Sequence, residues 1–208
     1  MEVIKIMLGD LQTNCYILVN DNKECTIIDP GSESEKVIEL LELQGLALKG
    51  ILITHGHFDH IGGVKGLQER YGVEIYAHNG ESEMMANANL NLSKMFSGNP
   101  IECKASKFLK DGDRLELGEG FSFEVIEVPG HTSHSLCFLH SKGHMFTGDT
   151  LFAGGIGRTD LYDGSPRDLM VNIREKLFAL DSNIKIYPGH GTSSTIGLEK
   201  ETNPYFLR

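Results

Sequence analysis

The segment Thr54–His60, Thr-His-Gly-His-Phe-Asp-His, constrains this chain more than any other stretch. It holds three histidines and one aspartate, and imidazole and carboxylate groups bind Zn²⁺ and neighbouring first-row metals at neutral pH. The apolar run 50–53 before it predicts a short buried strand, and the run 61–67 after it predicts the first turns of a helix. We therefore expect the cluster in a tight loop at the carboxyl end of a strand.

The spacing of these four side chains favours two metals over one. A single metal cannot easily take four ligands from so short a loop, because neighbouring side chains diverge. His55 and His57 can point at one position, and Asp59 and His60 at a second position beside it. The pattern thus predicts a two-metal site that needs further ligands from elsewhere in the chain.

Three residues later in the chain are candidates for those ligands. His131, Asp149 and His190 each follow a β-like run, and a glycine comes directly before each of them. Glycine suits a sharp turn at a strand end. Because the ends of several strands can meet at one edge of a sheet, we expect these side chains to join the histidine cluster.

Length and charge narrow the class of protein. The 208 residues suffice for one domain with a real core, and no linker rich in proline or serine interrupts them, so we predict a single domain over residues 1–208. The net charge of -10 and the absence of a basic stripe argue against a nucleic-acid partner. No apolar run approaches the length of a transmembrane helix, which argues against a membrane partner. The composition leaves the oligomeric state open.

Two further features bear on the compartment. The N-terminal run carries charged residues and is not predicted to be a signal peptide. The four cysteines form no C-x-x-C pair and are interpreted as reduced thiols; they are Cys15, Cys25, Cys103 and Cys137. Both features predict a cytoplasmic protein.

Hydrophobic periodicity and turn residues predict alternating strands and helices in two successive halves. Strands are expected over 2–7, 14–19, 25–29, 50–53 and 73–77, through much of 113–150, and up to His190. Helices are expected over 35–44, 64–71, 81–88 and 166–180, with a short one near 199–201. Ser32 or Ser34 is expected to cap the first helix. Residues 89–106 are polar and irregular, which predicts a mobile flap over the site.

The motif and its companions resemble the metallo-β-lactamase superfamily. Residues 55–60 fit its H-x-H-x-D-H signature, and His131, Asp149 and His190 follow in the order of its other ligands. The resemblance covers nearly the whole chain. It implies an α+β fold, a four-layer αβ/βα sandwich in which two sheets face each other with helices outside.

The resemblance also implies a ligand set. By this analogy the first metal is bound by His55, His57 and His131, the second by Asp59, His60 and His190, and Asp149 bridges both. Two divalent ions are expected, with zinc as the leading choice and iron or manganese as alternatives. Aspartate rather than cysteine at position 149 argues against a β-lactamase of the common zinc type.

Within the superfamily, residues 147–152 and 155–158 look most similar to glyoxalase II (hydroxyacylglutathione hydrolase). That enzyme has a C-terminal helical extension that this chain lacks, and here Thr159-Asp160 intervenes before the next aromatic residue. Residues 157–160 instead look like persulfide dioxygenases. We expect Arg158 and Tyr162 to bind the substrate; the plain alternatives are a surface ion pair for Arg158 and a core position for Tyr162.

The expected chemistry is hydrolysis of a small acyl thioester. Two metals about 3.5–4 Å apart can share a bridging hydroxide that acts as the nucleophile, and Asp59 can bind a metal and orient that hydroxide. A thiolate leaves without a strong general acid, and the motif offers no extra acid. Two dications, two carboxylates and one hydroxide leave a local charge of about +1, which favours an anionic thioester substrate.

Two other functions remain open at this point. A mononuclear iron dioxygenase would use His55, His131 and Asp149 as a two-histidine, one-carboxylate triad. The other possibility is a metal-binding module without catalysis, in which no coordination position would need to stay open for a substrate. The remaining histidines are interpreted as structural or surface residues; they are His78, His134, His140 and His144.

Overall fold

Strand β2 (Thr13–Val19) is buried along its whole length in the computed structural model, which describes residues 1–207. Ile17 packs into one hydrophobic core and its neighbour Leu18 into another. Successive side chains of a strand point to opposite faces of the sheet. The sheet that contains β2 is therefore covered on both faces.

This first sheet has six strands in the order of the sequence, β1-β2-β3-β4-β5-β6. Its other strands are β1 (Glu2–Leu8), β3 (Glu24–Ile28), β4 (Ala47–Leu52), β5 (Glu74–His78) and β6 (Lys107–Leu109). The first three strands are antiparallel, whereas β3 to β6 run parallel. The parallel strands deliver their carboxyl ends to one edge, where the His-rich loop follows β4.

The second sheet has the order β14-β13-β10-β9-β8-β7. Its strands are β7 (Arg114–Glu116), β8 (Ser122–Glu127), β9 (Leu136–His140), β10 (His144–Gly148), β13 (Lys185–Pro188) and β14 (Ser194–Thr195). Only β10 and β13 pair in parallel. A small hairpin of β11 (Leu151–Phe152) and β12 (Gly155–Ile156) follows β10.

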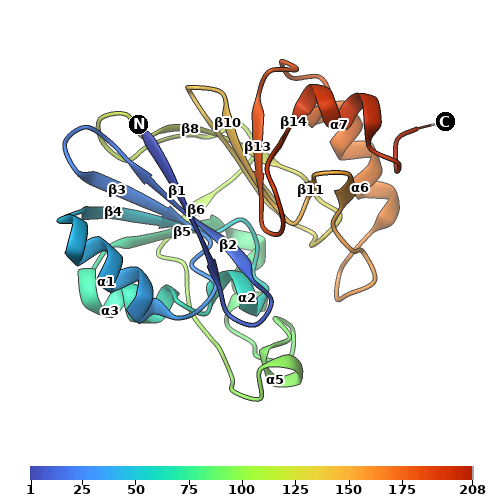
Figure 1. Ribbon diagram of the computed structural model, residues 1–208. Coiled ribbons are helices and arrows are strands. Elements are labelled where there is room, and N and C mark those ends of the chain that lie inside the picture. The colour runs from blue at the N-terminus through green and yellow to red at the C-terminus, as the bar shows by residue number, and fades with distance from the viewer. Residues whose placement is uncertain (208) are drawn as a thin grey trace.

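Helices cover the outer face of each sheet (Figure 1). On the first sheet, α1 (Ser34–Gln44) and α3 (Val64–Tyr71) bury Leu41 and Leu67 against the strands. On the second sheet the cover consists of α6 (Pro166–Asn172), a π-helical turn η2 (Ile173–Leu177) and α7 (Ile196–Thr202).

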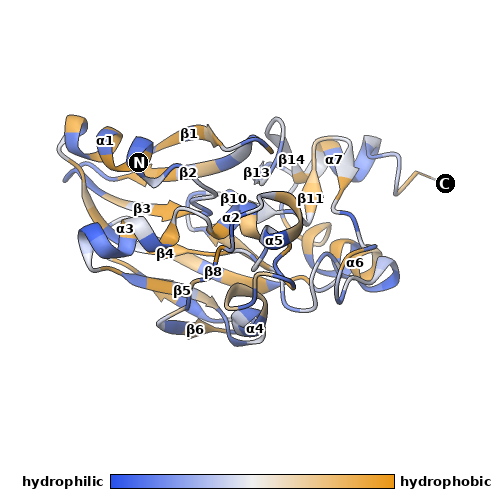
Figure 2. Cartoon of the chain, turned by 90° about the horizontal axis from the view of Figure 1, so that it is seen from below, coloured by the Kyte–Doolittle hydropathy of each residue, from blue (hydrophilic) through white to orange (hydrophobic). Residues whose placement is uncertain are grey.

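An aromatic core fills the space between the two sheets. Tyr16 of β2 contacts Phe146 of β10 edge to face at a centroid distance of 5.2 Å, and Phe123 and Phe138 lie in the same core. Figure 2 shows hydrophobic residues concentrated in central strands such as β3, β4 and β8, and hydrophilic residues along α3. Helices, sheet, sheet and helices make four layers, which confirms the predicted αβ/βα sandwich.

Several predicted elements differ in detail. Helix α4 (Ser82–Met85) is shorter than the predicted 81–88, and the predicted helix over 166–180 changes from α6 to a π-helical turn at Ile173. The predicted serine cap of α1 is wrong, because Glu33 begins the helix in a left-handed conformation without a side-chain cap. The predicted flap contains a one-turn helix, α5 (Ser93–Phe96), which lies beyond α2 (Phe58–Ile61) in Figure 1.

Within residues 1–207, none of the helices combines the length and the apolar character needed to cross a membrane. The four cysteines of this range are free thiols, and only Cys103 is not fully buried.

Candidate metal centre

The seven predicted ligand residues lie together at one edge of the two sheets. The first sheet supplies four of them through the loop after β4 and the short helix α2, and the second sheet supplies three at the ends of β8, β10 and β13. Each of them lies in one of three groups whose ligand atoms are within 4.8 Å of one another: His55, His57 and His131; His55, His60 and Asp149; Asp59, His60 and His190.

The first group consists of histidines only. His131 Nε2 lies 3.0 Å from His57 Nδ1 and 3.2 Å from His55 Nε2. All three rings are buried. Three imidazole nitrogens at such distances are typical of one face of a tetrahedral metal site, since ligands about 2.0–2.1 Å from an ion lie roughly 3.3 Å apart.

The group of Asp59, His60 and His190, called the second group from here on, contains a carboxylate. Asp59 Oδ2 lies 3.2 Å from His190 Nε2 and 3.5 Å from His60 Nε2. Asp149 lies between the two groups: its Oδ1 is 3.4 Å from His60 Nε2, and its Oδ2 is 3.5 Å from His190 Nε2 and 3.8 Å from His131 Nε2. Asp149 is therefore placed where one carboxylate can face two ions.

Unpaired polar atoms show that this cluster fits a metal centre. Within residues 1–207, the buried atoms His60 Nε2 and Asp149 Oδ1, which face each other at 3.4 Å in the cluster, have no hydrogen-bond partner. An unpaired buried polar atom costs about 1–3 kcal/mol, so natural proteins rarely leave several in one place without a ligand. Coordination to cations would satisfy the imidazole and carboxylate lone pairs that converge here.

Neighbouring groups fix the orientation of the histidine rings. His60 Nδ1 lies 3.0 Å from Asp29 Oδ2, His131 Nδ1 lies 2.8 Å from the carbonyl oxygen of Arg158, and His190 Nδ1 lies 3.2 Å from that of Leu11. A protonated Nδ1 donates to each of these oxygens, which leaves Nε2 with its lone pair toward the cluster. Such outer partners normally orient metal-binding histidines.

Asp29 is a functional residue that the sequence analysis missed. It accepts hydrogen bonds from the backbone N–H and the hydroxyl of Thr54 at 2.8 and 2.7 Å, besides its contact with His60. Its φ of 50° is unusual for a residue other than glycine. The available signal was a carboxylate at the end of the predicted strand 25–29, directly before a Pro-Gly pair.

Glu81 is the second residue that was missed. It is 1% exposed and accepts hydrogen bonds of 2.7 Å from the Gly56 N–H and from the Thr132 hydroxyl. Gly56 lies between His55 and His57, and Thr132 follows His131. One carboxylate therefore joins the two loops that carry the three histidines of the first group.

Burial and charge set the protonation of the cluster in opposite directions. Burial and the neighbouring histidines lower the pKa of His55, and burial together with His131 lowers the pKa of His57 to about 3. Burial also opposes charge on His60 and Asp59, but their mutual attraction outweighs it, so the pKa of His60 is raised and that of Asp59 is lowered. Lowered pKa values keep His55 and His57 neutral, whereas His60 and Asp59 stabilise each other in their charged forms.

Glycine is required beside Asp149. A Cβ at Gly189 would lie 2.3 Å from Asp149 Oδ1 and 2.6 Å from His60 Cε1. Gly148 has a φ of +47°, and a Cβ there would lie 2.4 Å from the Thr54 hydroxyl oxygen. These glycines let two strand ends approach the centre closely.

Comparison with known proteins places this geometry in a family. Residues 8–190 match the sequence pattern of the metallo-beta-lactamase superfamily. The chain belongs to the metallo-β-lactamase superfamily. It is 39% identical over 208 residues to hydroxyacylglutathione hydrolase GloC of Haemophilus influenzae. The aligned region covers 99% of this chain and 98% of that protein.

Two solved structures are also similar to this superfamily member. The BLEG-1 B3 metallo-beta-lactamase matches with a TM-score of 0.95 and 37% identity over 100% of both chains. TTHA1623, solved in a di-iron-bound form, matches with a TM-score of 0.87 and 35% identity over 98% of this chain and 100% of that one. The chain is accordingly a metallo-hydrolase, and its histidine-rich cluster is consistent with a dinuclear metal centre.

A cavity of about 480 Å³ opens onto the metal-binding cluster of this superfamily member. Five of the predicted ligands reach it; the other lining residues are Leu11, Phe58, Leu92, Phe96, Phe152, Ile156, Arg158 and Leu161. Apart from the ligands, Arg158 is the only polar residue of this lining within the described part of the chain, residues 1–207.

The structure places the two predicted substrate-binding residues differently. Arg158 lines the cavity, but its guanidinium forms a two-pronged ion pair with Asp160 at 2.8 and 2.9 Å. Tyr162 is half exposed and does not line the cavity; its neighbour Leu161 does. The role in substrate binding therefore stays a prediction for both residues.

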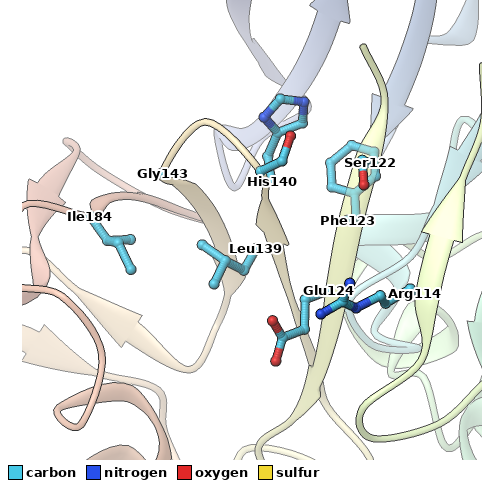
Figure 3. Close-up of a pocket in the computed structure, with 9 residues that line it drawn as sticks. Arg114, Ser122, Phe123, Glu124, Leu139, His140, Gly143 and Ile184 are labelled. Carbon is cyan, nitrogen blue, oxygen red and sulfur yellow. The ribbon is translucent and has the colours of Figure 1, made fainter. Parts of the chain in front are cut away.

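A second pocket, of about 370 Å³, lies at the opposite end of the second sheet (Figure 3). It is formed by the start of β8 and the end of β9, whereas His131 and Asp149 follow the carboxyl ends of their strands. Arg114 and Glu124 are register partners on β7 and β8, and His140 Nε2 is 2.7 Å from the Gly120 carbonyl oxygen. These groups do not form a catalytic cluster.

One more histidine–carboxylate group lies outside the centre. The His78 and His134 rings stack at 4.5 Å, and both face Glu127, with His134 Nδ1 at 2.9 Å and His78 Nε2 at 3.6 Å from Oε1. The Gly80 N–H donates to His78 Nδ1 at 3.0 Å, so in the neutral ring Nε2 carries the proton. A protonated nitrogen cannot bind a metal, and this group is best described as a hydrogen-bonded pair of histidines on one carboxylate.

Proposed function

We propose that this chain hydrolyses acyl thioesters at a dinuclear metal centre, with zinc as the leading metal. The observation that carries the proposal is the composition of the cavity beside the cluster. Besides the ligands, its lining holds apolar side chains and the paired Arg158, and so provides no proton donor for a basic leaving group. A thiolate is a weak base and departs without one, whereas an amine requires a proton.

The chain's own residues hold and orient the reacting groups. His55, His57 and His131 would hold one ion, Asp59, His60 and His190 the other, and Asp149 would contact both. Bound divalent ions supply an activated water and polarise the carbonyl oxygen. The Thr13 hydroxyl donates to Asp59 Oδ2 at 2.8 Å and fixes the carboxylate that orients the water.

Three similar proteins support different details or alternatives of this proposal. The name of the 39% identical relative, hydroxyacylglutathione hydrolase, supports a thioester substrate, and glutathione thioesters are anionic. The di-iron form of TTHA1623 supports iron as the alternative metal. Hydrolysis of β-lactams is a second candidate, because BLEG-1 is a B3 metallo-beta-lactamase at 37% identity. The third is the mononuclear iron dioxygenase, for which the second ligand group would be unnecessary.

A four-substrate assay separates these functions. Protein purified without added metal is analysed for zinc, iron and manganese, and then assayed with S-D-lactoylglutathione, an acetyl thioester, a penicillin, and glutathione persulfide with oxygen uptake. We expect two metals per chain, thioester cleavage with a high KM for the glutathione compound, and slow or no penicillin cleavage. Asp149→Ala should lose metal and turnover together.

Two outcomes of this assay would contradict the proposal. One iron per chain with oxygen consumption and no thioester cleavage would establish the dioxygenase. Penicillin cleavage that is faster than thioester cleavage would establish the β-lactamase.

A further inference from the structure

The walls of the cavity are apolar on the side away from the metal ligands. Phe58 lies between two ligands on α2, and its ring stacks on that of Phe96 from α5 at a centroid distance of 6.2 Å with an interplanar angle of 9°. Leu92, Phe152 and Ile156 complete this wall. A substrate group that lies along it must be apolar, because a peptide or a carboxylate would lose its hydration without new hydrogen bonds.

The segment that carries Phe96 is anchored to the metal loop. The backbone N–H of Phe58 donates to the carbonyl oxygen of Asn91 at 3.0 Å, and Asn91 is fully buried. Phe96 itself is 59% exposed. The anchored backbone holds an exposed aromatic ring beside the ligands, and only an apolar occupant of the cavity would cover that ring.

The charged residues that line an adjoining cavity also disfavour an anionic substrate. A third cavity, of about 380 Å³, adjoins the cavity at the metal-binding cluster and shares Leu11, Phe58, Asp59 and Phe96 with it. It continues past Asp10 and Glu33. None of its lining residues within 1–207 is a lysine or an arginine. The single cation of the first cavity, Arg158, is already paired with Asp160. Neither cavity therefore offers a free positive side chain for the carboxylates of glutathione.

We infer that the preferred substrate is a thioester whose acyl group is a short to medium alkyl chain, lying along the wall formed by Phe58, Leu92, Phe96, Phe152 and Ile156. This inference rests on the proposed thioesterase function and narrows its substrate class. Each methylene that enters an apolar site is worth about 0.8 kcal/mol, or about fourfold in kcat/KM. The preference must therefore grow with chain length until the chain outgrows the cavity.

A homologous series of substrates tests the inference. Protein reconstituted with zinc, with its metal content measured, is assayed with acetyl, butanoyl, hexanoyl and octanoyl thioesters of N-acetylcysteamine and with S-D-lactoylglutathione. The uncharged thiol stays constant while the acyl group lengthens. We expect kcat/KM to rise about fourfold per methylene over the shorter members and to exceed the value for lactoylglutathione.

Two matched variants test whether the dependence of kcat/KM on chain length arises at the apolar wall. Phe96→Ala should lower kcat/KM for the hexanoyl compound about tenfold and flatten the dependence on chain length. Phe108→Ala is the control, because Phe108 on β6 is similarly exposed, at 55%, and lines neither cavity. It should behave as the unmodified protein does. Both side chains are largely exposed, so neither substitution threatens the fold.

The outcomes distinguish a failure of the alkyl-chain preference from a failure of the proposed thioesterase function. If acetyl thioester and lactoylglutathione are cleaved but kcat/KM is flat or falls with chain length, the alkyl preference is wrong and the thioesterase function stands. If the dependence on chain length survives Phe96→Ala, the assigned wall is wrong. If no thioester is cleaved by protein that carries two metals, the proposed function fails and the inference fails with it.

Discussion

The buried carboxylate of Glu81 accepts a hydrogen bond of 2.7 Å from the backbone N–H of Gly56, the residue between two candidate ligands. Its other oxygen accepts from Thr132, on the loop of the second sheet. Glu81 thus links the two loops that carry His55, His57 and His131, and it is not itself one of the candidate ligands. Such outer-shell contacts typically change metal affinity by 10–100-fold.

We predict that Glu81→Ala weakens metal binding by about 10–100-fold, because both donors lose their acceptor and the two loops separate. Glu81→Gln should largely preserve it: the amide oxygen can accept from Gly56, and the amide N–H can donate to the Thr132 oxygen. The measurement is a competition titration with a chromogenic chelator. Glu83→Ala, two residues further along in α4, is the control, and equal affinity in all variants would show that this contact has no positioning role.

The same carboxylate predicts a pH dependence of the metal-free protein. Burial raises the pKa of Glu81 from 4.5 to about 7. A raised folded-state pKa means that the stabilisation by the bound proton is complete below about pH 4.5 and disappears as pH rises through about 7.

Glu81→Gln cannot ionise and should lack this loss, which amounts to about 3 kcal/mol by pH 8. Urea denaturation of both chelated proteins at pH 5 and pH 8 measures the difference. Stability curves that run parallel over this range would contradict a buried ionising Glu81.

Removing the metals should lower the melting temperature. Ions that bind only the folded chain at 100 times their Kd stabilise it by about 2.7 kcal/mol each, which corresponds to about 5–10 °C for a chain of this size. Differential scanning calorimetry before and after chelation tests this, and re-addition of zinc should restore the transition. An unchanged transition after verified metal removal would contradict the idea that the metals bind preferentially to the folded chain and stabilise it.

The Arg158–Asp160 ion pair predicts a gain of function. Asp160→Asn should free the guanidinium and lower the KM for lactoylglutathione by a fewfold, with little change for uncharged thioesters. Stability should hardly change, because exposed ion pairs contribute about 0–1 kcal/mol. Arg158→Ala should retain both metals, since only its backbone carbonyl contacts His131. Metal loss in Arg158→Ala would show that its side chain supports the centre.

The sequence predicted which residues lie together because that signal is local and chemical. The spacing of His55, His57, Asp59 and His60 separates two directions within one loop, and His131, Asp149 and His190 each stand at a strand end. The structure brings all seven together. Their roles as ligands, and the single-domain organisation of residues 1–208, stay predictions until metal binding and domain stability are measured.

The supporting residues could not be predicted in the same way. Glu81 and Asp29 act through contacts with Gly56 and Thr54, 25 residues away in the sequence. No short-range pattern distinguishes such a carboxylate from a solvated one. Helix α5 was missed for a related reason: its single turn buries Ser93, and its apolar residues Met95 and Phe96 are exposed, so the segment lacks the usual amphipathic signal.

The two candidate metal groups each draw on both sheets. His55 and His57 need His131, and Asp59 and His60 need His190, so neither half of the chain can complete a site alone. The histidine-rich loop precedes His131, Asp149 and His190 in the chain, so during synthesis it emerges without them. A metal ion would therefore meet a complete set of ligands only after the two sheets have packed together.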